Sequence, residues 1–534
     1  MTAETIIPII AGVFLIFLLG GGAMVAASKE PECLGHPKGL YMLFFAEMWE
    51  RFSFYGMRTL LIFYLTKHWL FDDGKSNLIY GAYGSLVYIT PLLGGYLADR
   101  YLGQRKAVLF GAVLLTIGHF LMAFEGSGGQ ADPTINIFWL ALSFIIVGSG
   151  FLNANISVMV GQLYPLTDAR RDSAYTIFYM GVNVGAAVGT IFAGYLGETY
   201  GWKYGFGAAG VGMLLGLVVF VLGKKTLNGA GEAPVNLSAG KQAAIYGSGI
   251  AAIGVVWALI QYLSVIQTLL IVAGVLLLLY VLYEAFKLEP HARDRIFAIL
   301  FLIALNPIFW GLFEQGGGSL NLYTDRFVDR AGVPASLFQS INPIYIIILA
   351  PLFAWAWVTL ARKGLEPSAP AKFGLALLQV GASFLVFVLG ANSVGPGVMT
   401  PVIFVFLIYL LQTTGELCLS PVGLSAMNRL APKFMASLIM GAWFYMTAVG
   451  QFVAGKIGEA TGGEGGEMSK EGTLAIYNEI GWITVAIGVG VLLVSPFIKK
   501  LMHLDTLKND ELAGQSQLAE PQAAGIDTAR ETKA

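Results

Sequence analysis

The sequence predicts an all-α protein that crosses a membrane many times, on the basis of two observations. Of its 534 residues, 56% are hydrophobic and 12% are charged, whereas a soluble protein has about 25% charged residues. Apolar stretches of roughly 20 residues, the length of a helix that spans a bilayer, also recur along the whole chain. A chain with a mean hydropathy of +0.70 needs lipid as its solvent. Its net charge of -1 gives no electrostatic basis for binding nucleic acid.

About fifteen stretches are long enough to span the bilayer. They cover residues 6–27, 40–66, 76–97, 106–124, 137–160, 173–199, 204–223, 243–263, 265–286, 296–323, 336–360, 373–391, 400–428, 437–458 and 475–498. No soluble domain fits between them. The longest polar segment, residues 503–534, is rich in Ala, Gln, Glu and Thr, and we predict that it is a disordered tail.

Lys and Arg residues in the short loops predict how the chain is oriented. One set of alternate loops carries 20 of these residues, and the opposite set carries six. Because positively charged loops stay on the cytoplasmic side of a membrane, we expect the first set and the C-terminal tail to be cytoplasmic.

The first apolar stretch, residues 6–27, has an unusual flank. A signal peptide normally begins with a basic region, whereas residues 2–5 here are Thr, Ala, Glu and Thr. We therefore expect an uncleaved extra helix with its N-terminus outside. Cleavage near residues 26–28, which read Ala-Ala-Ser, is the alternative.

The second span carries four charges, Glu47, Glu50, Arg51 and Arg58. A charge inside a membrane span costs at least ~2.5 kcal/mol, so it marks a functional position by default. At 100° per residue, Glu47, Arg51 and Arg58 fall within about 40° of one another. This helix therefore presents a polar face to a water-filled cavity or to other helices. Internal pairing of Glu with Arg, which would only hold helices together, is the alternative.

Two more carboxylates lie deep in other spans. Glu314 follows Pro307 and precedes three glycines, residues 316–318, so we expect its helix to be bent or broken close to the charge. Glu416 also has a proline nearby, Pro421. Discontinuous helices in mid-membrane are where transporters place binding sites. The alternative is structural pairing of these acids with the arginines of the second span.

The charges are thus divided between the two halves of the chain. The N-terminal half offers Arg51 and Arg58, and the C-terminal half offers Glu314 and Glu416. A zwitterion with separated ends has the charges to bridge such halves, although charge placement alone does not identify the cargo.

The second span also contains a recognisable signature. Residues 47–56 read EMWERFSFYG, which resembles the E-x-x-E-R-F-x-Y-Y-G signature of the proton-dependent oligopeptide transporter family, a branch of the major facilitator superfamily. Phe54 stands where the signature has a tyrosine. Further stretches are similar to motifs of the same family: GGYLADRYLGQRK at 94–106, FYMGVNVG at 178–185, FEQ at 313–315, GELCLSP at 415–421 and MGAWF at 440–444. The resemblance runs from about residue 39 to 500.

This resemblance implies the major facilitator fold of bacterial members, with two six-helix bundles around a central cavity. The N-terminal bundle would comprise residues 39–225 and the C-terminal bundle residues 293–502. Between them, residues 226–292 would contain two inserted helices, and residues 1–38 would hold the extra helix and a linker. Multi-pass insertion in the cytoplasmic (inner) membrane and a monomeric functional unit are also implied.

The resemblance further implies roles for individual residues. Arg51 and Arg58 would face the carboxylate of a di- or tripeptide, and Glu416 its amino group. The rest of the pocket would be lined by Tyr55, Tyr88, Asn153, Asn183, Trp310, Ser420 and Trp443, although lipid-facing packing is the alternative for Tyr88 and Trp443. Proton coupling would involve Glu47, Glu50, Arg51 and Glu314. The conformational loop would use Gly95, Asp99, Arg100, Gly103 and Arg105.

One position departs from the family pattern. The fourth family helix usually carries a lysine in a G-x-x-K-P-N-like stretch, and residues 150–155 here read GFLNAN, with Asn153 at the lysine position. Without that ammonium Glu47 and Glu50 lose a partner, and Arg51, which is always protonated, does not replace a titrating lysine. Asn153 still has the chemistry to hydrogen-bond a carboxylate. Proton coupling is therefore weaker here or is carried by other residues.

Proton-coupled symport of short peptides is the function that these features favour. A family member with another amino-bearing cargo, or an uncoupled facilitator, is the alternative. An enzyme is disfavoured, because the sequence has no His pair, nucleotide loop or nucleophile–base constellation, and the tail is too short for the signalling domain of a sensor. We expect no cofactor. Cys33 and Cys418 lie in very different contexts, so we expect neither a disulfide framework nor a metal site.

Overall fold

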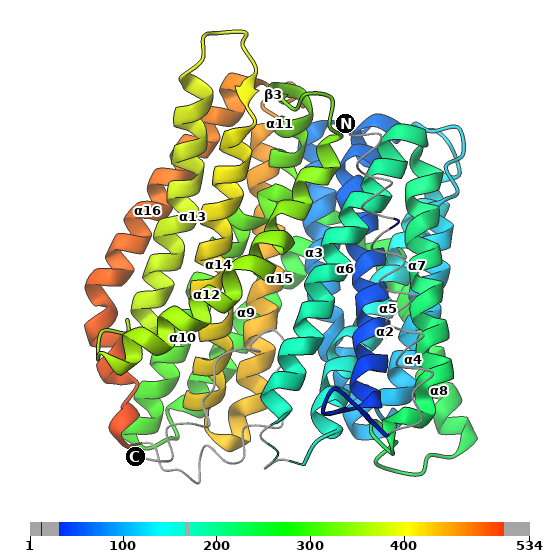
Figure 1. The fold of residues 1–534 in the computed structure, drawn as a ribbon, viewed down its shortest axis with the longest axis vertical. Helices are drawn as coiled ribbons and strands as arrows, with labels where there is room; N and C mark the ends of the chain where they lie inside the picture. The colour runs from blue at the N-terminus through cyan, green and yellow to red at the C-terminus, as the bar shows by residue number, and fades with distance from the viewer. Residues whose placement is uncertain (1–11, 13–30, 166–167, 169, 507–534) are drawn as a thin grey trace. The chain divides into compact units, whose positions relative to one another are not determined.

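The computed structural model describes residue 12, residues 31–165, residue 168 and residues 170–506 (Figure 1). Apart from residue 12, the predicted extra helix, 6–27, lies outside this description, as does the predicted tail from residue 507 onward. Within the described part, 13 helices are long and apolar enough to cross a membrane. The helix with four charges, α2, is not among those 13. Each span predicted between residues 31 and 506 corresponds to a helix, so the predicted all-α membrane fold is confirmed.

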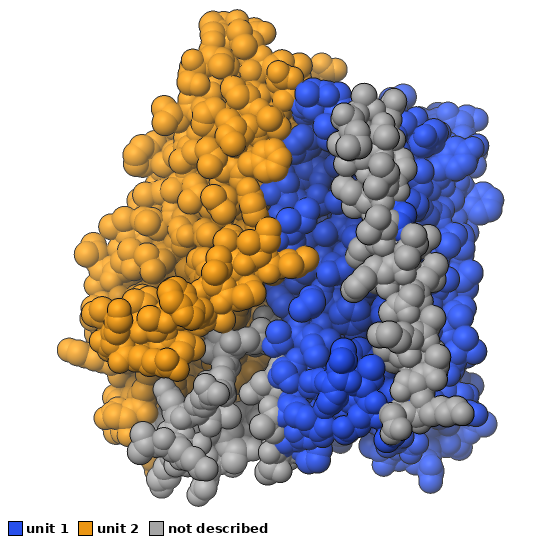
Figure 2. Space-filling model, in the orientation of Figure 1, with its two compact units in different colours: residues 1–71, 90–261, 330–344 blue, residues 72–89, 262–329, 345–534 orange. Residues whose placement is uncertain are grey.

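Two compact units divide the chain (Figure 2). Unit 1 comprises residues 1–71, 90–261 and 330–344, and unit 2 comprises residues 72–89, 262–329 and 345–534. These units are defined by contacts, and the bundle boundaries predicted from the sequence remain a prediction.

The elements that lie wholly in unit 1 include six helices long enough to span a membrane. In chain order they are β1 (Glu32–Cys33), β2 (His36–Pro37), α2 (Lys38–Phe63), the π-helical turn η1 (Tyr64–His68), η2 (Ala98–Leu102), α4 (Gln104–Met122), α5 (Ile135–Gln162), α6 (Arg170–Tyr200), α7 (Trp202–Gly223), η3 (Lys224–Leu227), α8 (Ala239–Leu259) and η5 (Ala335–Ser340).

The elements that lie wholly in unit 2 are also mostly long helices. They are α9 (Leu263–Ala285), α10 (Pro290–Phe313), η4 (Glu314–Gly316), α11 (Ser319–Phe327), β3 (Val328–Asp329), α13 (Ala369–Asn392), β4 (Thr400–Pro401), α14 (Ile403–Leu430), η6 (Lys433–Met435), α15 (Ala436–Thr461), α16 (Lys470–Leu501) and η7 (Leu504–Thr506). Arg295 of α10 donates a hydrogen bond to Thr506 Oγ1 at 2.6 Å, so the first residues of the predicted tail, 503–506, are held against a helix.

Glycines determine how closely the helices of unit 1 approach one another. Met48, Trp49 and Phe52 of α2 form a buried cluster against α6. A Cβ built on Gly189 of α6 would lie 2.2 Å from the carbonyl oxygen of Phe52. Helix α2 therefore lies with its backbone directly on α6, which fixes the helix that carries the four charges.

Helix α3 (Asp73–Leu97) is shared between the units. Residues 72–89 belong to unit 2 and residues 90–97 to unit 1, and Pro91 stands at the change. The first half is held in unit 2 by Asp73, whose Oδ1 accepts a hydrogen bond from Arg326 Nη2 at 2.8 Å. The second half packs on α5, since a Cβ on Gly94 would lie 2.0 Å from the carbonyl oxygen of Gly150. Because proline lacks a backbone donor, α3 lacks one helical hydrogen bond close to the point where the helix passes from unit 2 to unit 1.

Helix α12 (Ile341–Arg362) is divided in the same way, at residues 344 and 345. Just before it, η5 is attached to unit 1 by two hydrogen bonds. Thr59 Oγ1 of α2 donates to the carbonyl oxygen of Ser336 at 2.7 Å, and the backbone N–H of Ser336 donates to Glu198 Oε1 of α6 at 2.7 Å. These bonds join the start of α12 to the pair α2 and α6.

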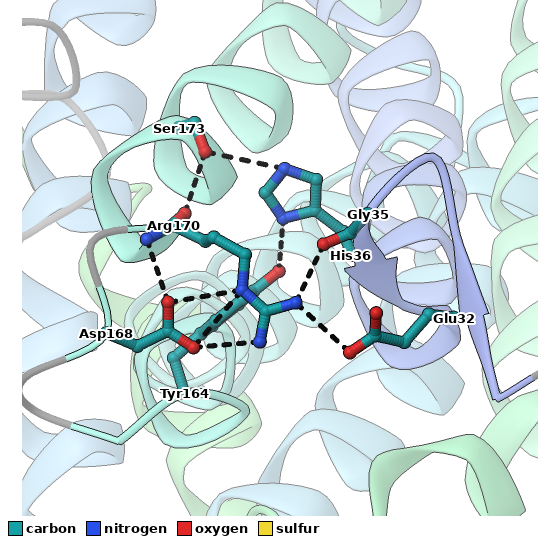
Figure 3. A network of polar contacts seen from close by, with 7 residues as sticks. All are labelled: Glu32, Gly35, His36, Tyr164, Asp168, Arg170 and Ser173. Carbon is teal, nitrogen blue, oxygen red and sulfur yellow. Dashed lines mark hydrogen bonds and ion pairs between the residues drawn. The ribbon is translucent and has the colours of Figure 1, made fainter.

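A polar network fixes the chain where it enters α2 (Figure 3). Arg170, the first residue of α6, donates to Glu32 Oε1 at 3.1 Å, to the carbonyl oxygen of Gly35 at 2.8 Å, and to Asp168 Oδ2 at 2.9 Å. His36 Nδ1 shares a hydrogen bond with the hydroxyl of Tyr164 at 2.7 Å. The β1–β2 turn is thereby attached to the end of α5 and the start of α6.

Candidate functional site

The carboxylates of α2 share a single guanidinium. Glu47 is 3% exposed and Glu50 is 1% exposed. Arg51 Nε donates to Glu47 Oε1 at 2.7 Å and lies 3.0 Å from Glu50 Oε2. One guanidinium balances one ionised carboxylate, so the second is balanced only by a proton or by another cation. Glu47 Oε2 and Glu50 Oε1 have no hydrogen-bond partner among the described residues, and buried polar groups of this kind are costly. A proton on one of the two carboxylates would both balance the charge and supply a donor.

Both arginines of α2 lie over aromatic rings of their own helix. Arg51 Cζ is 5.8 Å from the centre of the Phe54 ring, and Arg58 Cζ is 5.9 Å from that of Tyr55. A guanidinium over a ring face gains cation–π energy and loses little of its forked set of donors. The pairing of Arg51 with Glu47 and Glu50 agrees in part with the alternative of internal neutralisation. The guanidinium of Arg58 lies over the ring of Tyr55.

The two asparagines predicted for the pocket differ in their partners. Asn153 of α5 makes no hydrogen bond with Glu47 or Glu50 within the described ranges, and its buried Oδ1 has no hydrogen-bond partner there. The bond to a carboxylate that the sequence allowed is therefore not formed. Asn183 of α6 is 6% exposed, and its Nδ2 donates to the carbonyl oxygen of Tyr179 at 3.1 Å.

Unit 2 contains the predicted helix break. Helix α10 ends at Phe313, a 3₁₀ turn covers Glu314–Gly316, and α11 begins at Ser319. The carboxylate of Glu314 lies at this break and is 6% exposed. Gln451 Nε2 of α15 donates to Glu314 Oε1 at 2.9 Å. The prediction of a broken helix beside Glu314 is confirmed, and the structure adds an amide partner for the carboxylate.

Helix α14, which carries Glu416, is continuous. It runs from Ile403 to Leu430 with Pro421 inside, so the break that a nearby proline suggested does not occur here. Pro421 removes one backbone donor but leaves the hydrogen bonds of the other turns in place. Glu416 and Ser420 are therefore positioned by a regular helix, one turn apart on the same face.

The two tryptophans predicted to line the pocket have different surroundings. Trp310 of α10 packs edge-on against Phe309 and Phe313, and its buried indole N–H has no hydrogen-bond partner in the described chain. Trp443 of α15 is 3% exposed and fits against Gly423, where a Cβ would lie 2.2 Å from its ring. Trp443 is thus buried inside unit 2 and does not face lipid. Tyr88, near the end of the unit 2 part of α3, is half-buried.

The loop between α3 and α4 is held by the chain that leads to α8. Gly103 has φ 78°, and a Cβ there would lie 2.6 Å from the backbone nitrogen of Ala233. Arg105 Nη2 donates to the carbonyl oxygen of Ala230 at 3.0 Å. Asp99 Oδ1 accepts a hydrogen bond from Gln104 Nε2 at 2.6 Å. Gly95 has only Ala154 near its Cβ position, at 3.7 Å, and Arg100 is exposed.

Reasoning from the sequence missed one residue and one segment. The first is Gln451, which stands alone as an amide in an apolar stretch, and this isolation is the signal that marks it. The second is the segment 230–233, which contacts the α3–α4 loop and whose composition carries no such signal.

The chain is similar to several known proteins. A family model described as "PTR2: POT family" matches residues 105–463. The peptide transporter YePEPT of Yersinia enterocolitica is 39% identical over 461 residues, which is 79% of this chain and 88% of that protein. The uncharacterized transporter YclF of Bacillus subtilis is 36% identical over 90% of this chain and 98% of its own. A crystal structure of a POT family transporter in complex with 5-aminolevulinic acid has a TM-score of 0.77 and 33% sequence identity, covering 89% of this chain and 99% of that one.

Proposed function

This chain belongs to the POT family, a family of membrane transporters and not of enzymes, and on that premise we propose that it carries di- and tripeptides together with protons across the cytoplasmic (inner) membrane by alternating access. The C-terminal tail is cytoplasmic in this proposal, and the functional unit is a monomer. The observation that carries the proposal is the separation of charge, with guanidinium groups on α2 and carboxylates at η4 and on α14.

The peptide ends are recognised by these charges. Arg51 and Arg58 bind the terminal carboxylate, for which a planar fork of N–H donors is well suited. Glu416 binds the terminal ammonium. Both guanidinium groups are supported by aromatic rings of α2, and Glu416 is supported by a continuous helix. The remaining contacts come from the pocket residues predicted above: Tyr55, Tyr88, Asn153, Asn183, Trp310, Ser420 and Trp443.

Proton coupling runs through buried carboxylates. Glu47 and Glu50 share Arg51, and Glu314 is paired with an amide. A proton that neutralises one of these carboxylates changes the charge balance of its unit and so shifts the population of conformations. The loop residues Gly95, Asp99, Arg100, Gly103 and Arg105 take part in the conformational change.

The test is transport in proteoliposomes that contain the purified protein. A labelled dipeptide is supplied outside, and its uptake is measured with and without an inward proton gradient. We expect exchange against unlabelled internal dipeptide in both conditions and net accumulation only with the gradient. If no exchange of any dipeptide occurs, the proposed cargo is wrong. If exchange occurs and the gradient has no effect, peptide transport stands and proton coupling is wrong.

A second candidate is a family member with another amino-bearing cargo or with weak proton coupling. Two observations favour it. Asn153 supplies no ammonium beside Glu47 and Glu50, and one similar transporter was crystallised with 5-aminolevulinic acid, which has an amino group and a carboxylate at separate ends. Competition distinguishes the two candidates. If 5-aminolevulinic acid is transported and dipeptides neither compete nor accumulate, the second candidate replaces the first.

A further inference from the structure

Gln451 is an uncharged polar side chain in the middle of an apolar helix. It is 1% exposed, and its amide nitrogen donates to Glu314 Oε1 at 2.9 Å. A buried amide is costly unless it is hydrogen-bonded, so the bond to Glu314 accounts for its presence. The same bond acts on Glu314, because it gives the carboxylate a fixed donor at the helix break.

The other side of Gln451 lies against the first half of α3. A Cβ built on Gly84 would lie 2.6 Å from Gln451 Oε1 and 3.3 Å from Gln451 Cβ. One turn earlier, a Cβ on Gly81 would lie 2.7 Å from the carbonyl oxygen of Gln451 and 2.6 Å from Gly455 Cα. Helices α3 and α15 therefore approach backbone to backbone, and the absence of a side chain at Gly84 leaves the space that the amide of Gln451 occupies.

We infer that Gln451 is a positioning residue for Glu314, and that Gly84 of α3 sets the orientation of its amide. All three residues belong to unit 2. Gly84 faces the amide oxygen and so leaves the amide N–H aimed at Glu314. An amide oriented in this way favours a carboxylate oxygen, which accepts hydrogen bonds, over a protonated O–H at the same place. The contact between α3 and α15 thereby helps to set the hydrogen bond that Glu314 accepts. The inference rests on the proposed role of Glu314 in proton coupling.

The test compares two transport modes in the same proteoliposomes. Exchange of labelled for unlabelled dipeptide without a gradient reports on binding and conformational change, and accumulation under an inward proton gradient reports on coupling. Gln451→Met keeps the length of the side chain and removes the donor. Gly84→Ala adds a methyl group 2.6 Å from Gln451 Oε1, which pushes the amide from Glu314, and 3.3 Å from Gln451 Cβ, which asks for a shift of a few tenths of an ångström between the two helices.

We expect both variants to lose most of the accumulation that the proton gradient drives, because the fixed donor to Glu314 is removed, and to keep exchange and its KM close to those of the unmodified protein. The double variant should lose no more than Gln451→Met alone, because both changes remove the same bond. The matched controls are Gly490→Ala in α16, where no atom lies within 4 Å of the added Cβ, and Gln379→Met, which removes a different, half-buried amide of unit 2. Both should accumulate peptide normally.

Glu314→Gln separates failure of the inference from failure of the proposed function. If Glu314→Gln accumulates peptide normally, the coupling role of Glu314 is wrong. If Glu314→Gln loses accumulation while Gln451→Met and Gly84→Ala keep it, Gln451 does not position the coupling group and the inference alone is overturned. If the double variant is far worse than either single variant, Gly84 does not act through Gln451. Should Gly84→Ala fail to yield a monodisperse protein, Gln451→Met decides the outcome by itself.

Discussion

Arg51 is shared between two buried carboxylates of its own helix. Its Nε serves two buried carboxylates at 2.7 and 3.0 Å, so the guanidinium is already engaged when a cargo arrives. Arg58 lies two turns further along the same helix, over Tyr55. In the proposed mode of binding, the carboxyl end of a peptide meets one guanidinium held by acids and one supported by a ring. Glu416, on a regular helix of unit 2, is the carboxylate proposed for the amino end.

Replacing Glu416 by Gln should weaken binding of dipeptides that have a free amino group. A lost hydrogen bond to a charged group costs about 1.5–3 kcal/mol, which is at least tenfold in affinity. N-acetylated dipeptides, which bring no ammonium, should be affected much less. Competition of the two peptide classes against a labelled dipeptide measures the difference. Equal losses for both classes would show that Glu416 does not read the amino end.

His36 makes the network at the start of α2 sensitive to pH. Burial lowers the pKa of His36 below its usual 6.5, and the positive charge of Arg170 lowers that pKa further, while Asp168 and Glu32 act in the opposite direction. Between the folded-state pKa and 6.5 the unfolded chain binds a proton that the folded chain does not. The contribution of His36 to folding stability is therefore fully present above pH 6.5, and it is lost as the pH falls through the folded-state pKa.

We accordingly expect the Tm of the solubilised protein to drop between about pH 7.5 and about pH 5.5, and to drop less in His36→Gln. Glutamine keeps polar atoms near Tyr164 and Ser173 but does not titrate. The difference between the two proteins isolates His36 from the other groups that titrate in this range. Parallel curves for the two proteins would contradict the assignment.

At the scale of elements, glycines determine which helices touch. Gly189 places α6 on the backbone of α2, Gly94 places the second half of α3 on α5, and Gly81 places its first half on α15. In a membrane, small residues of this kind allow helices to gain van der Waals contact that lipid does not supply. Helix α3 owes its membership of both units to this arrangement.

Gly189→Ala should therefore destabilise unit 1. Its methyl group would lie 2.2 Å from the carbonyl oxygen of Phe52, and because that atom belongs to the backbone the helices must separate. Overpacking of this kind costs about 1–3 kcal/mol. Thermal unfolding in detergent should show a lower Tm than for Gly207→Ala in α7, where the added Cβ meets no atom within 4 Å. Equal Tm values would mean that the α2–α6 contact adjusts freely.

At the scale of the whole molecule, the proposed mechanism depends on the charge balance around the carboxylates of α2. Glu47 and Glu50 share the single guanidinium of Arg51 in unit 1, and Asn153 supplies no ammonium to balance the second carboxylate. A neutral amide exerts no pull that depends on the protonation of these carboxylates. A gradient-driven symporter needs proton binding to bias its conformations, so we expect efficient exchange of peptide and weak accumulation.

Asn153→Lys should increase accumulation of peptide under an inward proton gradient. The added ammonium would pair with the α2 carboxylates and respond when one of them is protonated. The measurement is the ratio of accumulation to exchange in proteoliposomes, with Asn153→Met as a control that changes size without adding charge. If the unmodified protein already accumulates peptide strongly and Asn153→Lys adds nothing, coupling runs entirely through other residues.

The sequence by itself determined the transmembrane helices, the break beside Glu314 and the position of each intramembrane charge. It did so because spanning length, insertion cost and the effect of proline and glycine act locally along the chain. It identified the residues of the candidate site by type, but not their partners. The continuous course of α14 past Pro421 is one result that local signals did not predict.

Only the tertiary structure decided which side chains meet. The amide of Gln451 at Glu314, the assignment of the two halves of α3 to different units, the contact of residues 230–233 with the α3–α4 loop, and the absence of a bond between Asn153 and the α2 carboxylates all depend on how closely helices pack. That packing is determined by pairs of residues far apart in sequence, such as Gly84 with Gln451 and Gly189 with Phe52. Local patterns carry no information about such pairs, because each depends on atoms that only the folded chain brings within contact distance.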